Sequence, residues 1–285
     1  MSDDLSNGDN GMEDLTNEFD PGQTHERHFD CICNRDDVSS AVDGELGVLA
    51  QEQDIVFSTS KELLVRDSGG NAIHAVVFAM RAGKESTRAD FPLTIQFLAR
   101  SVKTEEDFSV CKWYPVYDAG KEIDVTLTDI HEWANGMEAT LEGTILDGSR
   151  PVAFYDTRYA AKKLDYRIGE TFRFKLAALA YSVELLAKPK LRISAENADT
   201  GDTVTCVSQG GAQPDNCEFQ SKIYGMDETR FASHEYQVLQ IACARGDDGT
   251  DVLIPLVVRK DFFSRPLPRV GKSVRGLLWM QGYCV

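Results

Sequence analysis

Two stretches of the sequence share one pattern at a constant spacing of 102 residues. Residues 167–172 (RIGETF) lead to ALAY at 178–181, and residues 269–274 (RVGKSV) lead to MQGY at 280–283. In both stretches an aliphatic residue and a glycine precede a run of apolar residues, which is typical of a turn that enters a strand. The spacing is too long for a solenoid repeat, so it predicts two similar domains.

Alternating apolar residues and strong turn signals mark the chain from Lys121 onward. Hairpin turns are predicted at Asn135-Gly136 and Asp147-Gly148, and the segments around them alternate as strands do. Each copy of the repeat offers about five strands in roughly 70–100 residues, a size that commonly closes into a small barrel. The arrangement resembles an OB-fold, in which a helix connects the third strand to the next. Residues 159–165 predict this helix, whereas the equivalent residues 261–268 contain two prolines and do not.

The predicted fold class is therefore mainly β, with tandem small OB-like β-barrels in the C-terminal two-thirds of the chain. The first barrel covers residues 119–188 and the second covers residues 219–285. A polar linker or hairpin at 189–218, rich in Asn, Asp, Thr and Gly, lies between them.

The N-terminal part of the chain is predicted to differ from these barrels. Residues 1–27 are acidic and contain few apolar side chains, so we expect a flexible tail. Residues 28–118 predict a mixed α+β or β region. Its expected elements are a short helix at 38–51 and strands at 55–57, 63–65, 73–80, 93–98 and 110–117.

Charge and cysteine content limit the classes of partner. The formal net charge is −16 over 285 residues. It disfavours general nucleic-acid binding, which depends on Lys and Arg facing phosphates, and it disfavours anionic membranes. The seven cysteines are scattered and odd in number, and no apolar leader follows Met1. These features predict a cytoplasmic protein with reduced thiols.

A cluster of possible metal ligands lies early in the chain. His25, His28, Cys31 and Cys33 fall within nine residues, and imidazole and thiolate groups are good zinc ligands. The Cys-x-Cys spacing is tighter than the Cys-x₂-Cys of structural zinc sites, so the alternative is a polar segment with buried cysteines. A second thiol pair, Cys206 and Cys217, flanks a Gly-rich segment and is predicted to meet across a hairpin.

Two stretches combine aromatic and basic residues, as surfaces that bind single-stranded nucleic acid do. The first contains Tyr155, Tyr159, Lys162 and Lys163; the second contains Arg259, Lys260, Phe262, Phe263 and Arg265. The alternative is that the aromatic rings belong to the core and the cations to a solvated rim.

Catalytic motifs are not apparent in the sequence. It spells no phosphate-binding loop, and His131 and His234 stand beside Glu132 and Glu235, which alternation places on opposite strand faces. The leading hypothesis is a non-enzymatic binding or interaction protein without a cofactor, whose partner is an unknown protein or small ligand. The first alternative is a single-stranded nucleic-acid-binding protein, and the second is a metal-binding protein or enzyme using the His/Cys cluster.

Overall fold

The computed structural model describes ten segments of the chain. They are residues 26–32, 54–58, 62–66, 92–101, 108–146, 148–186, 204–209, 214–231, 234–263 and 267–285. The described residues are mainly β-strand, which confirms the predicted class at that level. The acidic tail up to residue 25, the predicted helix at 38–51 and the predicted strand at 73–80 lie outside the described residues.

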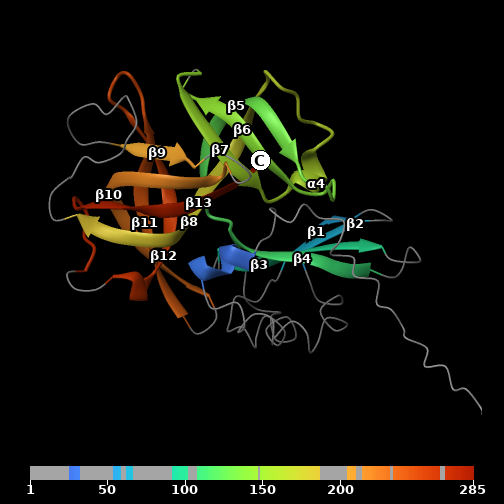
Figure 1. Ribbon diagram of the computed structural model, residues 1–285, viewed down its shortest axis with the longest axis horizontal. Helices are drawn as coiled ribbons and strands as arrows, with labels where there is room; N and C mark the ends of the chain where they lie inside the picture. The colour runs from blue at the N-terminus through green and yellow to red at the C-terminus, as the bar shows by residue number, and fades with distance from the viewer. Residues whose placement is uncertain are drawn as a thin grey trace, which may run out of the picture.

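A four-stranded antiparallel sheet and a short 3-10 helix make up the described N-terminal part (Figure 1). Its strands are confirmed at four of the positions that the apolar runs predicted. The elements are η2 (Glu26–Cys31), β1 (Asp54–Ser58), β2 (Glu62–Arg66), β3 (Leu93–Ser101) and β4 (Phe108–Tyr117). The sheet order follows the chain order, β1-β2-β3-β4.

The rest of the chain forms one nine-stranded sheet. Its elements are β5 (Lys121–Glu132), β6 (Ala139–Ile145), β7 (Arg150–Asp156), α4 (Tyr159–Lys162), β8 (Thr171–Leu186), β9 (Thr205–Ser208), β10 (Asn216–Phe231), β11 (His234–Arg245), β12 (Asp251–Arg259), η4 (Lys260–Phe262) and β13 (Ser273–Cys284). Alternation in the sequence anticipated all of these strands except β9. The helix α4 begins at the predicted residue but ends three residues earlier than expected.

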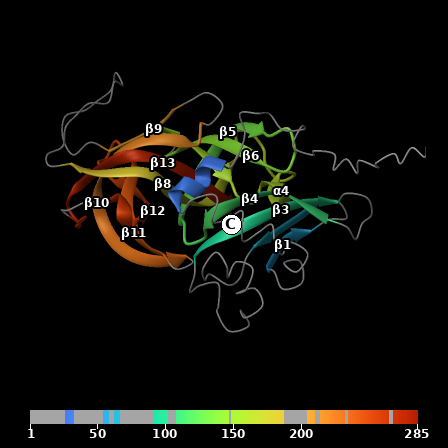
Figure 2. The ribbon, with the colours of Figure 1, turned by 60° about the horizontal axis from the view of Figure 1, so that its bottom comes forward.

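The strand pairings of this sheet form two circuits. The first runs β5-β6-β7-β13-β8 and returns to β5, and the second runs β10-β11-β12-β8-β13 and returns to β10. Both circuits contain β8 and β13, which pair with each other antiparallel over most of their length. Figures 1 and 2 show the result as two curved groups of strands side by side, with β8 and β13 running through both.

The residue pairs that face each other in one circuit correspond to pairs in the other circuit when 102 is added to or subtracted from the residue numbers. Tyr155 on β7 lies opposite Gln281 on β13 in a parallel pair, and Val257 on β12 lies opposite Leu179 on β8 in the other parallel pair. The residues of the second pair stand 102 positions from those of the first. At the centre of the shared ribbon Ala178 lies opposite Met280, its own counterpart at that spacing.

The two glycines of the repeated motif make the same backbone contacts. The Gly169 N–H donates to Leu127 O at 2.7 Å, and the Gly271 N–H donates to Ile223 O at 2.8 Å. Their φ angles are 87° and 85°, a region that favours glycine because it has no Cβ. Each glycine thus lets the turn enter the last strand of its copy.

Two layers of core follow from these pairings. The inward side chains of both circuits form one apolar cluster that includes Leu176, Ala178 and Met280. The opposite face of the shared ribbon carries Leu179 and Trp279, and η2, β3 and β4 pack on that face with Phe29 and other apolar side chains. Figure 2 shows η2 and the four-stranded sheet lying against the larger sheet.

Part of the segment predicted as a polar linker or hairpin is regular strand. Thr205–Ser208 forms β9, which pairs with β10 between Cys217 and Gln220. The sequence of this region is dominated by turn-forming residues, and four residues alternate too briefly to signal a strand. The hydrogen bonds from β10, which only the tertiary structure supplies, make β9 a strand.

Candidate functional site

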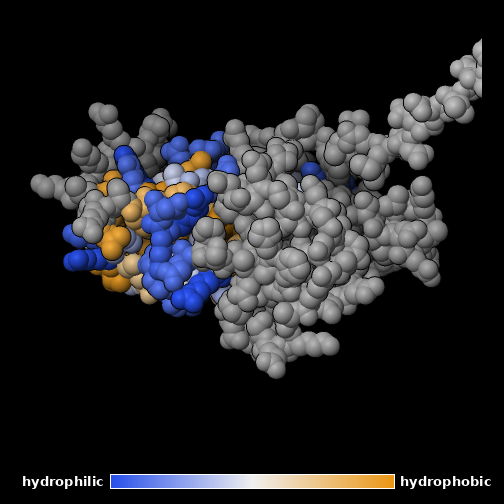
Figure 3. Space-filling view, turned by 90° about the horizontal axis from the view of Figure 1, so that it is seen from below, coloured by the Kyte–Doolittle hydropathy of each residue, from blue (hydrophilic) through white to orange (hydrophobic). Residues whose placement is uncertain are grey.

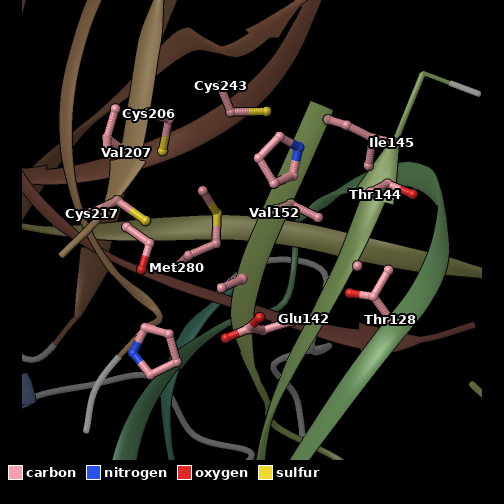
Figure 4. Close-up of a pocket in the computed structure, with 15 residues that line it drawn as sticks. Thr128, Glu142, Thr144, Ile145, Val152, Cys206, Val207, Cys217, Cys243 and Met280 are labelled. Carbon is pink, nitrogen blue, oxygen red and sulfur yellow. The ribbon is translucent and has the colours of Figure 1, made fainter. Parts of the chain in front are cut away.

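A cavity of about 430 Å³ lies where the two circuits meet (Figure 4). One wall comes from β6 and β7 of the first circuit. The other comes from β10 and β11 of the second circuit and from β9, the edge strand that pairs with β10. The lining residues are Thr128, Glu142, Gly143, Thr144, Ile145, Pro151, Val152, Ala153, Cys206, Val207, Ser208, Pro214, Cys217, Cys243 and Met280. The cavity is therefore built by residues that stand up to 152 positions apart in the chain.

Sulfur atoms gather on the wall that β9, β10 and β11 provide. Cys206, Cys217 and Cys243 line it, and the Met280 thioether lies beside them (Figure 4). A hydrogen bond with Cys217 and burial raise the pKa of Cys206, and burial raises the pKa of Cys243 to about 12. The Cys206 and Cys243 thiols consequently remain protonated at neutral pH and present a soft, weakly polar surface.

The opposite wall carries polar groups. Glu142 and Thr144 project from β6, and Thr128 lies on β5 where the pairing with β6 shifts by one residue. Glu142 Oε1 lies 3.0 Å from His131 Nε2, and Asp129 Oδ2 lies 3.8 Å from the same nitrogen. His131 therefore faces Glu142 of the neighbouring strand β6 and Asp129 two residues earlier on its own strand, rather than Glu132, its neighbour in the sequence.

Gly143 explains how β6 can lie so close to β5 at this wall. A Cβ atom there would lie 2.5 Å from Val125 Cγ1 and 2.7 Å from Thr126 O. Both distances are shorter than van der Waals contact, so a side chain would force the two strands apart. Only the structure identifies this role, because a glycine in an alternating segment has several explanations.

The first aromatic and basic stretch is built into the fold. The Tyr155 side chain is fully buried, and its hydroxyl donates to Glu138 Oε1 at 2.7 Å. The Tyr159 hydroxyl donates to Glu132 Oε2 at 2.8 Å, and Lys163 Nζ donates to Gly136 O at 2.6 Å. Lys162 is half-buried in α4. Tyr155 and Tyr159 are thus held by carboxylates and do not present open stacking faces.

The second stretch lies at the end of β12 and in η4. Arg259 pairs with Asp261 at 2.5 Å, and Lys260 Nζ lies 2.8 Å from Glu235 and 3.0 Å from Glu228. Phe262 and Phe263 are half-buried against the apolar cluster, and Arg265 lies outside the described residues. The described cations of this stretch therefore face carboxylates.

The described surface is mixed in character. Figure 3 shows hydrophilic side chains gathered in a band beside apolar ones on one face of the molecule. Acidic partners for the cations reduce the local positive field that a phosphate backbone requires.

His28 and Cys31, from the predicted metal cluster, are packed in η2 against the shared ribbon. The His28 ring stacks on Trp279 with centroids 3.7 Å apart, and its Nδ1 lies 2.5 Å from the Tyr181 hydroxyl. Burial raises the pKa of the Cys31 thiol well above its usual value. His25 and Cys33 lie outside the described residues. Within the described segments, no three His, Cys, Asp or Glu side chains form a group that fits a metal ion.

The sequence identified two of the cavity residues. Cys206 and Cys217 were predicted to meet across a hairpin, and β9 and β10 do bring them together. It did not single out Glu142, Thr144 or Met280, because these residues are separated in the chain and match no motif.

No helix in the described segments is long and apolar enough to cross a membrane. No protein-family model matches the chain, and no curated protein matches it either.

Proposed function

We propose that this protein is a non-enzymatic binding protein whose ligand is a small amphipathic molecule held in the cavity between the two circuits. The observation that carries the proposal is the cavity itself, about 430 Å³ in volume and lined from both circuits. Sites for small molecules commonly have 300–1,000 Å³ and combine an apolar lining with a few polar groups, as this cavity does.

The chemistry of the two walls favours a ligand with two different ends. An apolar body suits the sulfur-rich wall of Cys217, Cys243 and Met280. A hydrogen-bond donor or a cation suits the opposite wall, where Glu142 offers carboxylate oxygens and Thr144 offers a hydroxyl.

We also propose that each circuit is an OB-like barrel, with its fifth strand supplied by the other copy. The five-strand circuits, the helix α4 between β7 and β8, and the equivalent registers support this interpretation. OB-folds bind ligands on the face of their second and third strands, which here are β6 and β7. The cavity lies against these strands, and this correspondence adds support for a binding role.

Single-stranded nucleic acid remains the alternative ligand. The burial of Tyr155 and the pairing of Lys260 with two glutamates weigh against it.

Cytoplasmic location is part of the proposal as well. The five cysteines described with side chains are all unpaired, as a reducing compartment would keep them.

The test uses Nile red, a neutral apolar fluorophore, with the full chain and with Thr144→Trp. Thr144 lines the polar wall of the cavity from β6 and is half-buried, so a larger side chain there occupies part of the cavity. We expect the wild-type chain to bind the dye and Thr144→Trp to bind it at least about tenfold more weakly, which is about 1.4 kcal/mol.

Val270→Trp serves as the control, because it places the same indole side chain at an exposed position that does not line the cavity. It should bind the dye as the wild type does. Equal binding by all three proteins would contradict the cavity as the site. Micromolar binding of a single-stranded oligonucleotide, lost in the combined Arg259→Ala and Lys260→Ala variant, would favour the alternative instead.

A further inference from the structure

Cys206 and Cys217 occupy diagonal positions on a pair of antiparallel strands. Cys206 lies opposite Phe219, and Cys217 lies opposite Ser208, two residues further along both strands. Diagonal neighbours share a face of the sheet, and the Cys217 thiol lies close enough to Cys206 to raise the pKa of Cys206. Figure 4 shows both sulfur atoms at the same end of the cavity.

The surroundings of the pair differ from those of Cys31. Cys31 is fully buried in the core beneath η2, whereas Cys206 is half-buried on an edge strand that pairs only with β10 in the described sheet. Cys217 is 97% buried, and the cavity reaches both residues. A small uncharged molecule that enters the cavity can therefore reach both Cys206 and Cys217.

Short strand length makes a covalent link possible. A disulfide needs Cβ atoms about 4 Å apart, closer than most diagonal pairs. β9 has four residues and forms the edge of its sheet, so it can shift toward Cys217 without disturbing the core strands. Cys243, the third thiol of the cavity, instead points its sulfur to Val252 O at 3.5 Å across the next strand pair.

We propose that Cys206 and Cys217 form a redox modification site at which hydrogen peroxide closes a reversible disulfide between β9 and β10. The modification does not depend on the proposed ligand, although the link would narrow the sulfur-rich end of the cavity.

The reaction has two balanced steps. The Cys206 thiolate attacks one oxygen of hydrogen peroxide, the O–O bond breaks, and Cys206 becomes a sulfenic acid. The hydroxide that leaves takes up the proton lost by the Cys206 thiol and forms one water. The Cys217 thiolate then attacks the Cys206 sulfur, the S–O bond breaks, and the second water leaves with the proton from Cys217. The two thiols lose two hydrogens in total, and the peroxide is reduced to two waters.

Thiol ionisation controls the rate of the first step. Because burial and the hydrogen bond with Cys217 raise the pKa of Cys206, the thiolate fraction at neutral pH is small. The site therefore oxidises slowly at neutral pH and faster as the pH rises.

Peptide mapping tests the proposal on the full chain. No Lys or Arg lies between Ile193 and Ser221, so trypsin releases Cys206 and Cys217 together in peptide 193–222, which contains no other cysteine. After treatment with hydrogen peroxide and alkylation of free thiols, we expect this peptide to be two hydrogens lighter and to carry no alkyl group. Dithiothreitol should restore both alkylation sites.

Three variants complete the test. Cys243→Ser and Cys284→Ser should form the same linked peptide, because neither cysteine belongs to the pair. Cys217→Ser should leave a sulfenic acid on Cys206 that dimedone traps. The proposal is wrong if the oxidised wild-type peptide still takes two alkyl groups, if Cys206 advances to a sulfinic acid beside an alkylated Cys217, or if either residue links to Cys243.

Discussion

Asp156 shows how burial changes one side chain at the end of β7. It is almost completely buried, accepts a hydrogen bond from the Tyr166 hydroxyl at 2.5 Å and another from the Arg158 N–H at 2.8 Å. Burial raises the pKa of Asp156 to about 6, although Tyr166, Arg158 and Lys162 all oppose this change. The carboxylate organises the turn into α4 but is costly to keep charged.

This pKa predicts a specific pH dependence of stability. The folded pKa lies above the unfolded value near 4, so the folded state binds the proton more tightly, and the resulting stabilisation is lost as pH rises from about 4 through about 6. Relative to Asp156→Asn, the wild type should lose up to about 3 kcal/mol of unfolding free energy across this range. Denaturant unfolding at a series of pH values measures it; parallel curves for the two proteins would contradict the prediction.

At the scale of elements, η2 is held by its backbone as well as by apolar side chains. The Tyr236 hydroxyl on β11 donates to Ile32 O at 2.5 Å, next to the end of η2. Both side chains belong to the apolar cluster that covers the shared ribbon. The contact links the start of the described chain to the second circuit, 204 residues away.

Removing that hydroxyl tests how firmly η2 is attached. Tyr236→Phe should lower the unfolding free energy by about 1–3 kcal/mol, because a buried carbonyl loses its partner. Tyr224→Phe is the control, since its hydroxyl bonds to Asp251 in a partly exposed position and its loss should cost less. Urea unfolding of the three proteins measures both changes. An equal loss of unfolding free energy in the two variants would contradict the prediction that the bond to Ile32 stabilises the fold more than the partly exposed bond to Asp251.

At the scale of the whole molecule, the ribbon of β8 and β13 belongs to both circuits. Ala178 and Met280 lie opposite each other at its centre, and each circuit uses one half of each strand. Neither circuit can lose β8 or β13 without opening the other. The two therefore form one cooperative unit rather than two independently folding domains.

Substitution in either circuit should consequently destabilise both. Phe154→Ala in the first circuit and Phe219→Ala in the second each remove a buried ring, at a cost of about 3–5 kcal/mol. Hydrogen exchange followed by mass spectrometry should show reduced protection in β6 and in β11 for both variants. Protection lost only in the circuit that carries the substitution would show two independent units.

The sequence predicted the strands of this protein better than their arrangement. Val125 and Leu127, or Phe172 and Phe174, alternate visibly because a half-buried strand must turn every second side chain inward. The turns at Gly169 and Gly271 could also be predicted, since a left-handed backbone conformation before a strand favours glycine. By contrast, β9 and the short extent of α4 depend on partners that are remote in the chain.

The sequence could predict only the part of the candidate site whose residues lie close together in the chain. Cys206 and Cys217 flank one hairpin, so their meeting could be inferred, and the structure brings them together. Glu142, Val207 and Met280 converge from three strands, and no spacing in the chain signals that convergence.

By itself, the sequence determined the alternation, the turns and the repeated Gly-strand motif, because each depends on backbone geometry within a few residues. Only the tertiary structure decided that the two copies share β8 and β13, that Tyr155 and Tyr159 are held by glutamates, and that a cavity remains between the circuits. The physical reason is that strand pairing, burial and charge pairing act between residues far apart in the chain, and their outcome depends on which surfaces meet.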